Sequence, residues 1–449
     1  MPVEASRLEE VRLTSFKSFT GQCLPLQDLT VLIGRNGSGK SNALDALLVL
    51  SRLALGEPVR DALDGPRAAE EPIRGGAAGC APLGADEFTV GCRVRSPLGV
   101  FDLDVRLAVF PEVRVLRETL TAVEGVRYAG RRLGQERVLL ASDPPDKRRG
   151  DLNVRYFNGR RGVDPAVPFL SDRLLTSQAP VRVPATSEAT RLVHMAAREV
   201  LGVLREVFLL DPVPHLMRQY VNRQDSELRR NADNLSASVA ALEADDPGAF
   251  ARLTELIGGM PEYPVRAISS VGTPLGDVQV VLREAGFHGS EHDVPARLVS
   301  DGMLRFLAFG TALLSAPTMG DGDGGDIAAV QRHLVIEEVE NGLYPTQAAR
   351  VLRLMKEESR RRRIDVLFTT HSPALLNSLE AADHSGVVVC TRDGESGESR
   401  LTPLPELPGY VELMAAGDLG DAVTKGRLAD ATEPRTGETV SIEDFLGSL

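Results

Sequence analysis

The stretch LTVLIGRNGSGKSNALDALLVL, residues 29–50, decides the fold of the chain. Its first part, Leu29–Ile33, is a nearly continuous apolar run that predicts a buried central β-strand. The loop Gly34–Gly39 is rich in glycine, and from Lys40 onward leucines recur on one stripe of a predicted helix. Strand, glycine loop and helix in this order indicate an α/β fold with a phosphate-binding loop.

The segment Gly34–Ser41 fits the pattern G-x4-G-K-[ST] at every position. Glycines let backbone N–H groups converge on phosphate oxygens, and the helix N-terminus adds its positive dipole. We expect Lys40 to reach the β- and γ-phosphates of ATP and Ser41 to ligate Mg²⁺. A structural glycine turn is the alternative, and the flanking strand and helix count against it. The predicted nucleotide-binding residues are Gly34, Arg35, Asn36, Gly37, Ser38, Gly39, Lys40, Ser41 and Asn42.

Two acids follow a second apolar run, Leu334-Val-Ile-Glu337-Glu338. A parallel strand delivers such residues to its C-terminal edge, where ligands bind in these sheets. Adjacent strand residues point in opposite directions, so Glu337 can face the metal while Glu338 faces an attacking water. A solvated strand end is the alternative, and the presence of the phosphate loop favours the catalytic interpretation.

A histidine follows a third apolar run, Ile364–Thr369, in the sequence TTHSP. Placed at the same sheet edge, His371 can bond the γ-phosphate and sense its loss. A structural histidine is the alternative interpretation.

A second candidate anion cradle precedes the predicted helix Leu304–Leu314. Ser300, Asp301 and Gly302 stand at its N-terminus, where backbone N–H groups are free. One nucleotide needs only one such cradle. A simple solution is a head-to-tail homodimer in which each cradle closes on the ATP of the other copy. A plain N-cap is the alternative.

The rest of the chain predicts a P-loop ATPase head with a mixed or parallel sheet, an antiparallel β subdomain and a compact helical insertion. Alternating segments such as Phe88–Val94 indicate the antiparallel strands. Residues 55–86 are predicted as a mobile loop, residues 142–185 as irregular, and Glu188–Phe208 as a helix. The predicted units are an N-terminal ATPase lobe at 1–160, a helical insertion lobe at 161–270, a C-terminal ATPase lobe at 271–425 and a tail at 426–449.

Composition and charge indicate where the protein acts and which partners are expected. The chain has 449 residues, 43% of them hydrophobic, and a net charge of −12, which counts against extensive nonspecific coating of nucleic acid. We see no run of about eighteen apolar residues, no secretory signal and no CxxC pair. These features predict a cytoplasmic location without a membrane partner.

The motifs together resemble the RecF, SMC and OLD-like ABC ATPases, and most of all the compact "AAA family" members. The segments that carry the resemblance are FKSF at 16–19, GRNGSGKSNALDAL, SDGMLR, IEEVENGLYP and TTHSP, in that order. It spans about residues 8–420.

The resemblance implies a role for each matching residue. Glu337 takes the metal-side Walker B position, Glu338 the catalytic base and His371 the switch histidine, with Lys40 also catalytic. It further implies that Ser300, Asp301 and Gly302 form the trans signature and that Asn341 and Gly342 form the D-loop at the dimer contact.

The sequence departs from the family pattern at several points. Glu337 replaces the usual Asp, so turnover is expected to be slow, and Asp301 replaces the first glycine of the transporter signature. Gln135 and Asn158 are the candidates for the Q-loop. No Toprim-type acidic cluster follows His371, so we predict no nuclease in this chain.

Other classes fit the sequence less well. A transporter subunit lacks the spacing, since about 260 residues separate Ser41 from the signature. A GTPase would need an Asn-Lys-x-Asp motif, and a small-molecule kinase would need no trans signature. The acidic stretch Gly320–Asp326 resembles part of a calcium loop but lacks the later bidentate acid.

Two functional hypotheses remain open. The first is an ATP-gated clamp or switch in DNA repair or anti-phage defence, contacting DNA and acting with a separate effector protein. The second is a regulatory ATPase that binds a protein partner without contacting DNA. Both imply ATP and Mg²⁺ as cofactors.

Overall fold

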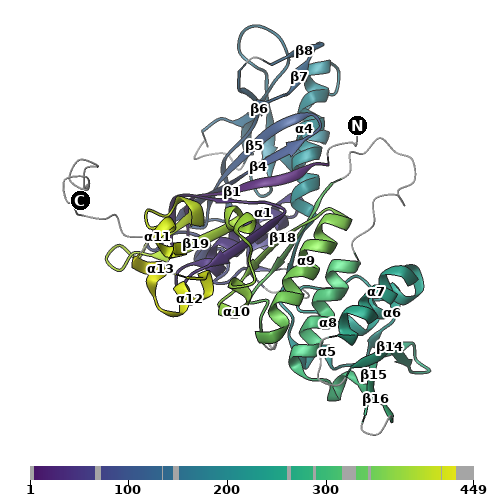
Figure 1. Cartoon of the computed structure of the whole chain (residues 1–449). Helices are drawn as coiled ribbons and strands as arrows, with labels where there is room; N and C mark the ends of the chain where they lie inside the picture. Colours follow the sequence, from purple (N-terminus) through teal and green to yellow (C-terminus); the bar gives the residue numbers. More distant parts are fainter. Residues whose placement is uncertain are drawn as a thin grey trace, which may run out of the picture.

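A long mixed sheet organises the chain (Figure 1). The structure, a computed structural model, describes residues 5–65, 72–133, 135–144, 151–259, 264–286, 290–315, 330–341, 345–415 and 417–430. Within these ranges the largest sheet has fourteen strands, in the order β11-β10-β9-β6-β5-β4-β1-β2-β20-β19-β3-β18-β17-β12. Their bounds are β1 Arg7–Phe16, β2 Phe19–Pro25, β3 Leu29–Ile33, β4 Glu87–Ser96, β5 Gly99–Ala108, β6 Arg114–Glu124, β9 Arg137–Ser142, β10 Asp151–Tyr156, β11 Ala166–Leu170, β12 Val207–Leu210, β17 Arg332–Ile336, β18 Ile364–Thr369, β19 Val387–Arg392 and β20 Ser399–Pro403.

The strands β19, β3, β18, β17 and β12 are all parallel and carry the predicted site at their C-terminal ends. In β3 the side chains alternate between two cores: Leu32 belongs to one core, whereas Val31 and Ile33 belong to the other. Burial on both faces explains why this strand is a continuous apolar run. The predicted strands Leu29–Ile33 and Ile364–Thr369 are confirmed.

The N-terminal part of the sheet is antiparallel, as predicted. β1 pairs with β2 and β4, and β4, β5, β6, β9, β10 and β11 follow as successive antiparallel neighbours. A two-stranded ribbon of β7 (Arg127–Tyr128) and β8 (Arg131–Arg132) lies at the upper end in Figure 1.

Helices cover both faces of the sheet. α1 and α4 contact each other on one side, and the buried leucines of α1 belong to the core that includes β1, β4 and β5. α8, α9 and α10 pack in the other core against β17 and β18. No helix in the described ranges is long and apolar enough to cross a membrane. The bounds are α1 Lys40–Ala54, α2 Val59–Asp64, α3 Leu175–Arg182, α4 Glu188–Arg205, α8 Asp301–Leu314, α9 Ala348–Arg362, α10 Pro373–Leu376, α11 Tyr410–Ala415, α12 Leu419–Thr424 and α13 Arg427–Asp430.

The insertion differs from the predicted compact helical lobe at 161–270. Residues of β11, α3 and α4 join the N-terminal part, and β12 adds a parallel strand to the central sheet. The remaining insertion is a mixed α/β lobe at the lower right of Figure 1, in which α6 and α7 contact a small sheet and α8. Its elements are α5 Pro214–Met217, α6 Leu235–Asp245, α7 Pro247–Gly258, β13 Val221–Asn222, β14 Val265–Gly272, β15 Asp277–Ala285 and β16 Glu291–Pro295.

The predicted helix Glu188–Phe208 was three residues too long, because α4 ends at Arg205. Ser187 caps α4 by accepting a hydrogen bond from Thr190 N–H at 3.2 Å, which sets the start. The helix ends at Arg205, and the next four residues, VFLL, form β12. A short apolar run at a helix end fits either structure by periodicity alone. The segments 55–86 and 142–185 were predicted as a mobile loop and as irregular, yet they contain α2, β10, β11 and α3.

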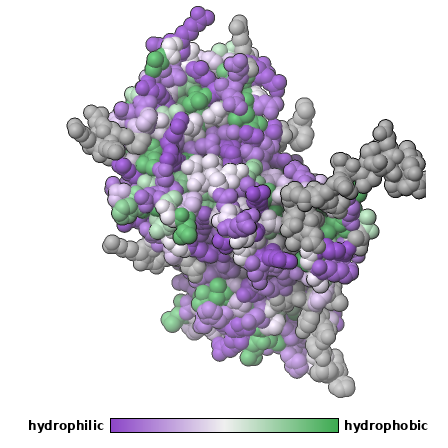
Figure 2. Space-filling model, turned by 90° about the vertical axis from the view of Figure 1, so that its left-hand side faces the viewer, coloured by the Kyte–Doolittle hydropathy of each residue, from purple (hydrophilic) through white to green (hydrophobic). Residues whose placement is uncertain are grey.

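Exposed hydrophobic residues are scattered over the surface. Figure 2 shows one face on which apolar residues lie singly or in small groups among hydrophilic ones. Leu83, Val181 and Leu275 are examples of large apolar residues that are almost fully exposed. Scattered exposure of this kind is normal for a folded protein and marks no site by itself.

A buried carboxylate ties the α/β lobe to the ATPase core. Glu358 on α9 is 1% exposed and accepts a hydrogen bond at 3.0 Å from Arg252 on α7. Arg362, also buried, lies 3.4 Å from the second carboxylate oxygen. Arg252 also contacts Glu357, which is 53% exposed.

Glu358→Ala should therefore lower the free energy of unfolding by about 3–5 kcal/mol, because it removes the buried carboxylate that neutralises Arg252 and the buried Arg362. Glu357→Ala is the matched control and should cost less than about 1 kcal/mol. Urea denaturation followed by circular dichroism measures both. Equal losses in the two variants would contradict this account of the contact.

Candidate functional site

A cavity of about 320 Å³ opens where the C-terminal ends of β3, β17 and β18 meet. It combines backbone from the glycine loop with charged and polar side chains from four separate segments. Its lining residues are Asn36, Gly37, Gly39, Lys40, Ser41, Asn42, Glu337, Glu338, Thr369, His371 and Arg392. The sequence-predicted loop, carboxylates and histidine therefore lie together.

Two glycines of the loop pack too closely on β19 and β20 for any side chain. A Cβ on Gly34 would lie 2.1 Å from the carbonyl oxygen of Cys390, and one on Gly39 would lie 2.4 Å from Ser399 Oγ. Gly39 also has a φ of 113°, which L residues with side chains rarely adopt. Cys390 Sγ donates to the carbonyl of Ser38 at 3.3 Å. The loop is thus fixed from behind, with its front open to the cavity.

Lys40 lies folded over the loop. Its Nζ donates to the carbonyl oxygens of Gly34 at 2.8 Å and Arg35 at 3.0 Å. Burial lowers the pKa of Lys40, against nearby acids that raise it. Ser38 Oγ is buried and has no hydrogen-bond partner within the described structure. The ammonium of Lys40 is bonded only to neutral carbonyls, and the hydroxyl of Ser38 is unpaired. Both features fit a site that receives an anionic phosphate.

Ser41 and Glu337 meet although they are 296 positions apart in the chain. Ser41 Oγ donates to Glu337 Oε1. Arg74 contacts both oxygens of Glu337, with its Nη1 at 3.1 Å and 3.0 Å from them. A hydroxyl beside a carboxylate is the oxygen donor pair that Mg²⁺ takes next to a bound triphosphate, so these residues fit the predicted ion.

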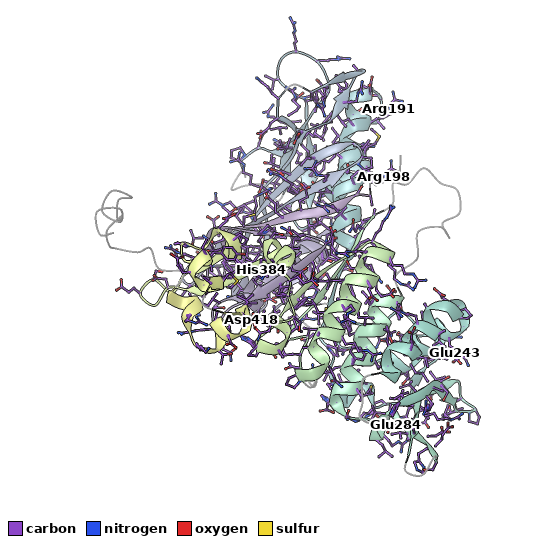
Figure 3. The ribbon with its side chains drawn as sticks, viewed as in Figure 1. Arg191, Arg198, Glu243, Glu284, His384 and Asp418 are labelled. Carbon is purple, nitrogen blue, oxygen red and sulfur yellow. The ribbon has the colours of Figure 1, made fainter. Side chains whose placement is uncertain are left out.

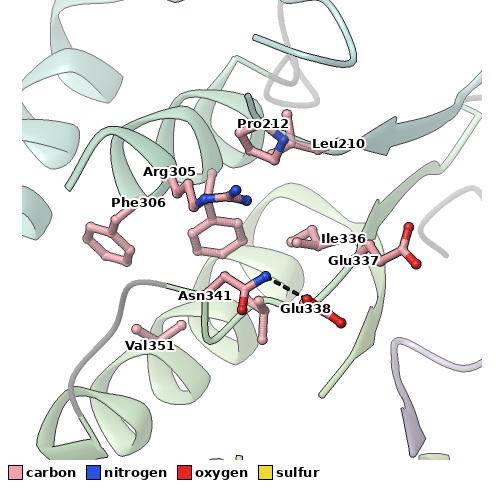
Figure 4. A pocket seen from close by; sticks show the side chains of 11 residues that line it. Leu210, Pro212, Arg305, Phe306, Ile336, Glu337, Glu338, Asn341 and Val351 are labelled. Atoms are coloured by element: carbon pink, nitrogen blue, oxygen red, sulfur yellow. Dashed lines mark hydrogen bonds between the residues drawn. The ribbon is translucent and has the colours of Figure 1, made fainter. Parts of the chain in front are cut away.

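Glu338 leaves β17 in a different direction from Glu337 (Figure 4). Its backbone has a φ of 50°, an uncommon left-handed conformation for a residue with a side chain. Two bonds hold it: its N–H donates to Thr369 Oγ1 at 2.8 Å, and its Oε2 accepts from Asn341 Nδ2 at 2.6 Å. A strained residue fixed by its surroundings is a feature of functional sites. The second predicted D-loop residue, Gly342, lies outside the described residues.

His371 lines the same cavity from the end of β18. Its backbone N–H donates to Glu340 Oε1. Burial and then the neighbouring charge of Lys40 lower its pKa, so the imidazole is neutral at neutral pH. A neutral ring can donate one hydrogen bond to a phosphate oxygen.

The predicted signature lies elsewhere. Ser300 caps α8 by accepting a hydrogen bond from Met303 N–H at 3.3 Å. The N-cap that the sequence offered as the alternative interpretation is therefore present. Arg218 fixes the turn by donating to Val299 O and Asp301 Oδ1, each at 2.7 Å. Ser300 and Asp301 are exposed, and they are not among the residues that line the cavity. Gln135 and Asn158, the Q-loop candidates, do not line it either.

Several residues of the site had no recognisable sequence signal. Arg74 comes from a Gly- and Ala-rich stretch that was predicted as a mobile loop. Asp45 is 2% exposed on α1, and a charged residue within the apolar stripe of that helix could have indicated it. Arg392 is the last residue of the apolar strand β19, a position that many structural residues share. Thr369, the last residue of β18, belongs to the TTHSP segment that the sequence did single out. The calcium-like stretch Gly320–Asp326 lies outside the described residues.

Three features define a P-loop ATPase of the ABC type: the glycine loop after β3, the two carboxylates after β17 and the histidine after β18. The chain belongs to the family described as "AAA domain, putative AbiEii toxin, Type IV TA system", whose model matches residues 29–377. The predicted membership of the AAA-family ATPases is confirmed.

Solved structures similar to the chain include SMC head domains. One is the SMC head domain from Thermotoga maritima, with 16% identity, a TM-score of 0.39, and coverage of 88% of this chain and 98% of that one. An SmcHead bound to the C-winged helix domain of ScpA has 14% identity, a TM-score of 0.44 and coverage of 88% and 97%. The Pyrococcus furiosus Smc head with an extended coiled coil, bound to the C-terminal domain of ScpA, has 13% identity, a TM-score of 0.44 and coverage of 91% and 100%. No curated protein matches the chain.

Gly39→Ala should weaken ATP binding by about a hundredfold or more, because backbone strain and the clash with Ser399 together displace the loop. Gly21→Ala is a control for positive φ, since Gly21 has a φ of 63° and no atom within 4 Å of its added Cβ. Its affinity should stay unchanged. Titration with a fluorescent ATP analogue checks both, and tight binding by Gly39→Ala would contradict the close-packing argument.

Proposed function

We propose that the chain binds and hydrolyses ATP at this cavity, between two copies of itself. The observation that carries the proposal is the convergence of Lys40, Ser41, Glu337 and Glu338 on one cavity. Four such groups from two separate strand ends are more than a structural glycine turn needs.

Each residue has a proposed role in the reaction. Lys40 exchanges its two loop carbonyls for phosphate oxygens, and the backbone N–H groups of 34–39 surround the same phosphates. Ser41 and Glu337 would hold Mg²⁺, which when bound supplies positive charge to the triphosphate. Glu338 accepts a proton from the attacking water, and its contact with Asn341 aligns the carboxylate. His371 donates a hydrogen bond to the γ-phosphate.

Slow turnover is part of the proposal. Glu337 is one methylene longer than the aspartate usual at this position, so its oxygens lie further from β17. We propose that it acts on the ion at a less favourable distance than an aspartate would.

The second copy completes the site. Ser300 and Asp301 are exposed and absent from the cavity of their own chain, and they stand at the N-terminus of α8, where the helix dipole favours an anion. We propose that Ser300, Asp301 and Gly302 of one copy close over the γ-phosphate held by the other. Asn341 is exposed beside Glu338, as expected for a D-loop at that contact.

Glu338→Gln should abolish hydrolysis while ATP stays bound and the dimer accumulates, because the amide cannot accept the proton of water. The expected loss in rate is about a hundredfold to ten-thousandfold. Lys40→Ala is the matched control and should remain monomeric with ATP. Light scattering after gel filtration distinguishes the two, and a monomeric Glu338→Gln with unaltered turnover would contradict the mechanism.

We further propose that ATP binding gates a clamp or switch that acts in anti-phage defence or DNA repair with a separate effector protein. The description of the family as a toxin of a toxin–antitoxin system supports the defence setting. A cytoplasmic location remains part of this proposal.

A local basic surface supports contact with DNA despite the acidic chain. Residues 127–161 contain ten Arg or Lys and four Asp or Glu. Exposed arginines stand on three neighbouring segments: the β7–β8 ribbon, the turn after β10 and the start of α4, where Gly159 packs on Tyr128 and Ala189. Within the described residues none of them forms an ion pair. They are Arg127, Arg132, Arg160, Arg161 and Arg191, and we call them the arginine cluster.

The alternative is a regulatory ATPase whose ligand is a protein. The α/β lobe supports it, because this lobe carries acidic residues such as Glu243 and Glu284 at the end of the molecule opposite Arg191 and Arg198 (Figure 3).

Binding of duplex DNA at 50 and 200 mM salt separates the two functions. If the arginine cluster contacts phosphates, affinity should fall steeply with salt, and Arg160→Ala/Arg161→Ala should reduce the slope of log K against log salt by about 2. Arg283→Ala, on an exposed arginine of the α/β lobe, is the control and should leave the slope unchanged. Absence of binding at either salt concentration would favour the protein partner.

A further inference from the structure

Arg74 lies where the predicted ion belongs. Its guanidinium donates to both oxygens of Glu337 and, through Nη2, to the carbonyl of Ser41 at 3.0 Å. Its Nε lies 3.0 Å from Asp45 Oδ1. One side chain therefore holds the metal-side carboxylate, the backbone of the metal-side serine and a buried acid at the same time.

Arg74 supplies positive charge to two carboxylates that are little exposed, Asp45 and Glu337. Asp45 is 2% exposed and has Lys17 at 2.7 Å as its other partner. Glu337 is 16% exposed, and Arg74 is its cationic partner among the described residues. A carboxylate so little exposed is costly without a neighbouring positive charge.

Magnesium and Arg74 compete for the same oxygens. An ion that takes Glu337 and Ser41 as ligands would place two positive charges beside a guanidinium that already uses both carboxylate oxygens. Repulsion between like charges at hydrogen-bond distance disfavours binding of Mg²⁺ at Glu337 while Arg74 stays in this position.

We infer that Arg74 holds the place of Mg²⁺ in the nucleotide-free protein and is released from Glu337 when the Mg²⁺-bound nucleotide enters. This inference rests on the proposed nucleotide site and adds a latch to it. Lys17 anchors the backbone beside this contact, because Lys17 Nζ donates to Arg74 O at 2.8 Å and Lys17 N–H donates to Cys80 O at 3.0 Å. Neither bond involves the guanidinium, so the Arg74 side chain can leave Glu337 while these two bonds hold the segment 72–80.

Two other roles for Arg74 predict different behaviour. If Arg74 contacts a phosphate, its loss weakens nucleotide binding whether or not Mg²⁺ is present. If Arg74 only stabilises the fold, its loss lowers stability equally in the free and the nucleotide-bound protein. The latch predicts that the effect of the substitution on nucleotide affinity and its effect on stability both depend on Mg²⁺.

The test compares Arg74→Ala and Arg74→Gln with Arg60→Ala, an exposed arginine on the neighbouring helix α2. The probe is a fluorescent, non-hydrolysable ATP analogue, titrated into the full chain with Mg²⁺ and with EDTA. Loss of the competing guanidinium should tighten binding about three- to tenfold with Mg²⁺ and leave it unchanged in EDTA. Arg60→Ala should match the unaltered chain in both.

A second readout is the melting temperature. Both Arg74 variants should melt about 2–4 °C lower without nucleotide, and this difference should vanish with Mg²⁺ and the analogue, because the ion then replaces the lost charge. Weaker binding in both buffers, or an equal loss of melting temperature in both states, would overturn the latch. If the unaltered chain binds the analogue in neither buffer, the nucleotide site and the latch are both wrong. If it binds and Arg74→Ala shows no gain with Mg²⁺, the latch alone is wrong.

Discussion

The hydrogen bond from Ser41 to Glu337 is the contact on which the site depends. It joins the first turn of α1 to the end of β17, and it forms because β18 lies between β3 and β17 with all three strands parallel. That order brings three strand ends to one edge, where backbone N–H groups, a lysine, two carboxylates and a histidine share one cavity. The insertion between α1 and β17 is long, yet the sheet absorbs it: its first part extends the antiparallel strands, β12 joins the parallel edge, and the rest forms a separate lobe.

Several residues at or near the cavity have backbone conformations or buried polar groups that lower the local stability of the fold. Gly39 and Glu338 adopt positive φ values, Ser38 Oγ and Glu340 Oε2 are buried without partners in the described structure, and Asp45 is buried among cations. Such groups persist where the surrounding fold over-determines them, and here β19, β20 and β18 do so from behind the site. In the proposed function, a bound phosphate or cation gives these unpaired groups partners and gives Lys40 a charged acceptor in place of two carbonyls.

The central sheet and the motif residues were predictable from sequence because their patterns are local. Leu29–Ile33 and Ile364–Thr369 are short, mostly apolar runs, which is the pattern of a parallel strand that is buried on both faces. The α/β lobe was not predicted, although β14 and β15 are rich in valine and flank the short loop 273–276, which is a local signal for a β-hairpin. Arg74 was beyond prediction. Its partners lie 29 and 263 positions away, and nothing in a Gly- and Ala-rich stretch distinguishes this arginine from a solvated one.

Sharing of each nucleotide between two copies is the central claim, and a mixing experiment tests it most directly. Lys40→Ala destroys the loop and Ser300→Arg destroys the signature, so each variant alone should have no ATPase activity. In an equal mixture half of the dimers combine both variants, and one of their two sites joins an intact loop to an intact signature. Activity should therefore return to about a quarter of the unaltered rate per chain. A mixture as inactive as its two components would contradict the claim.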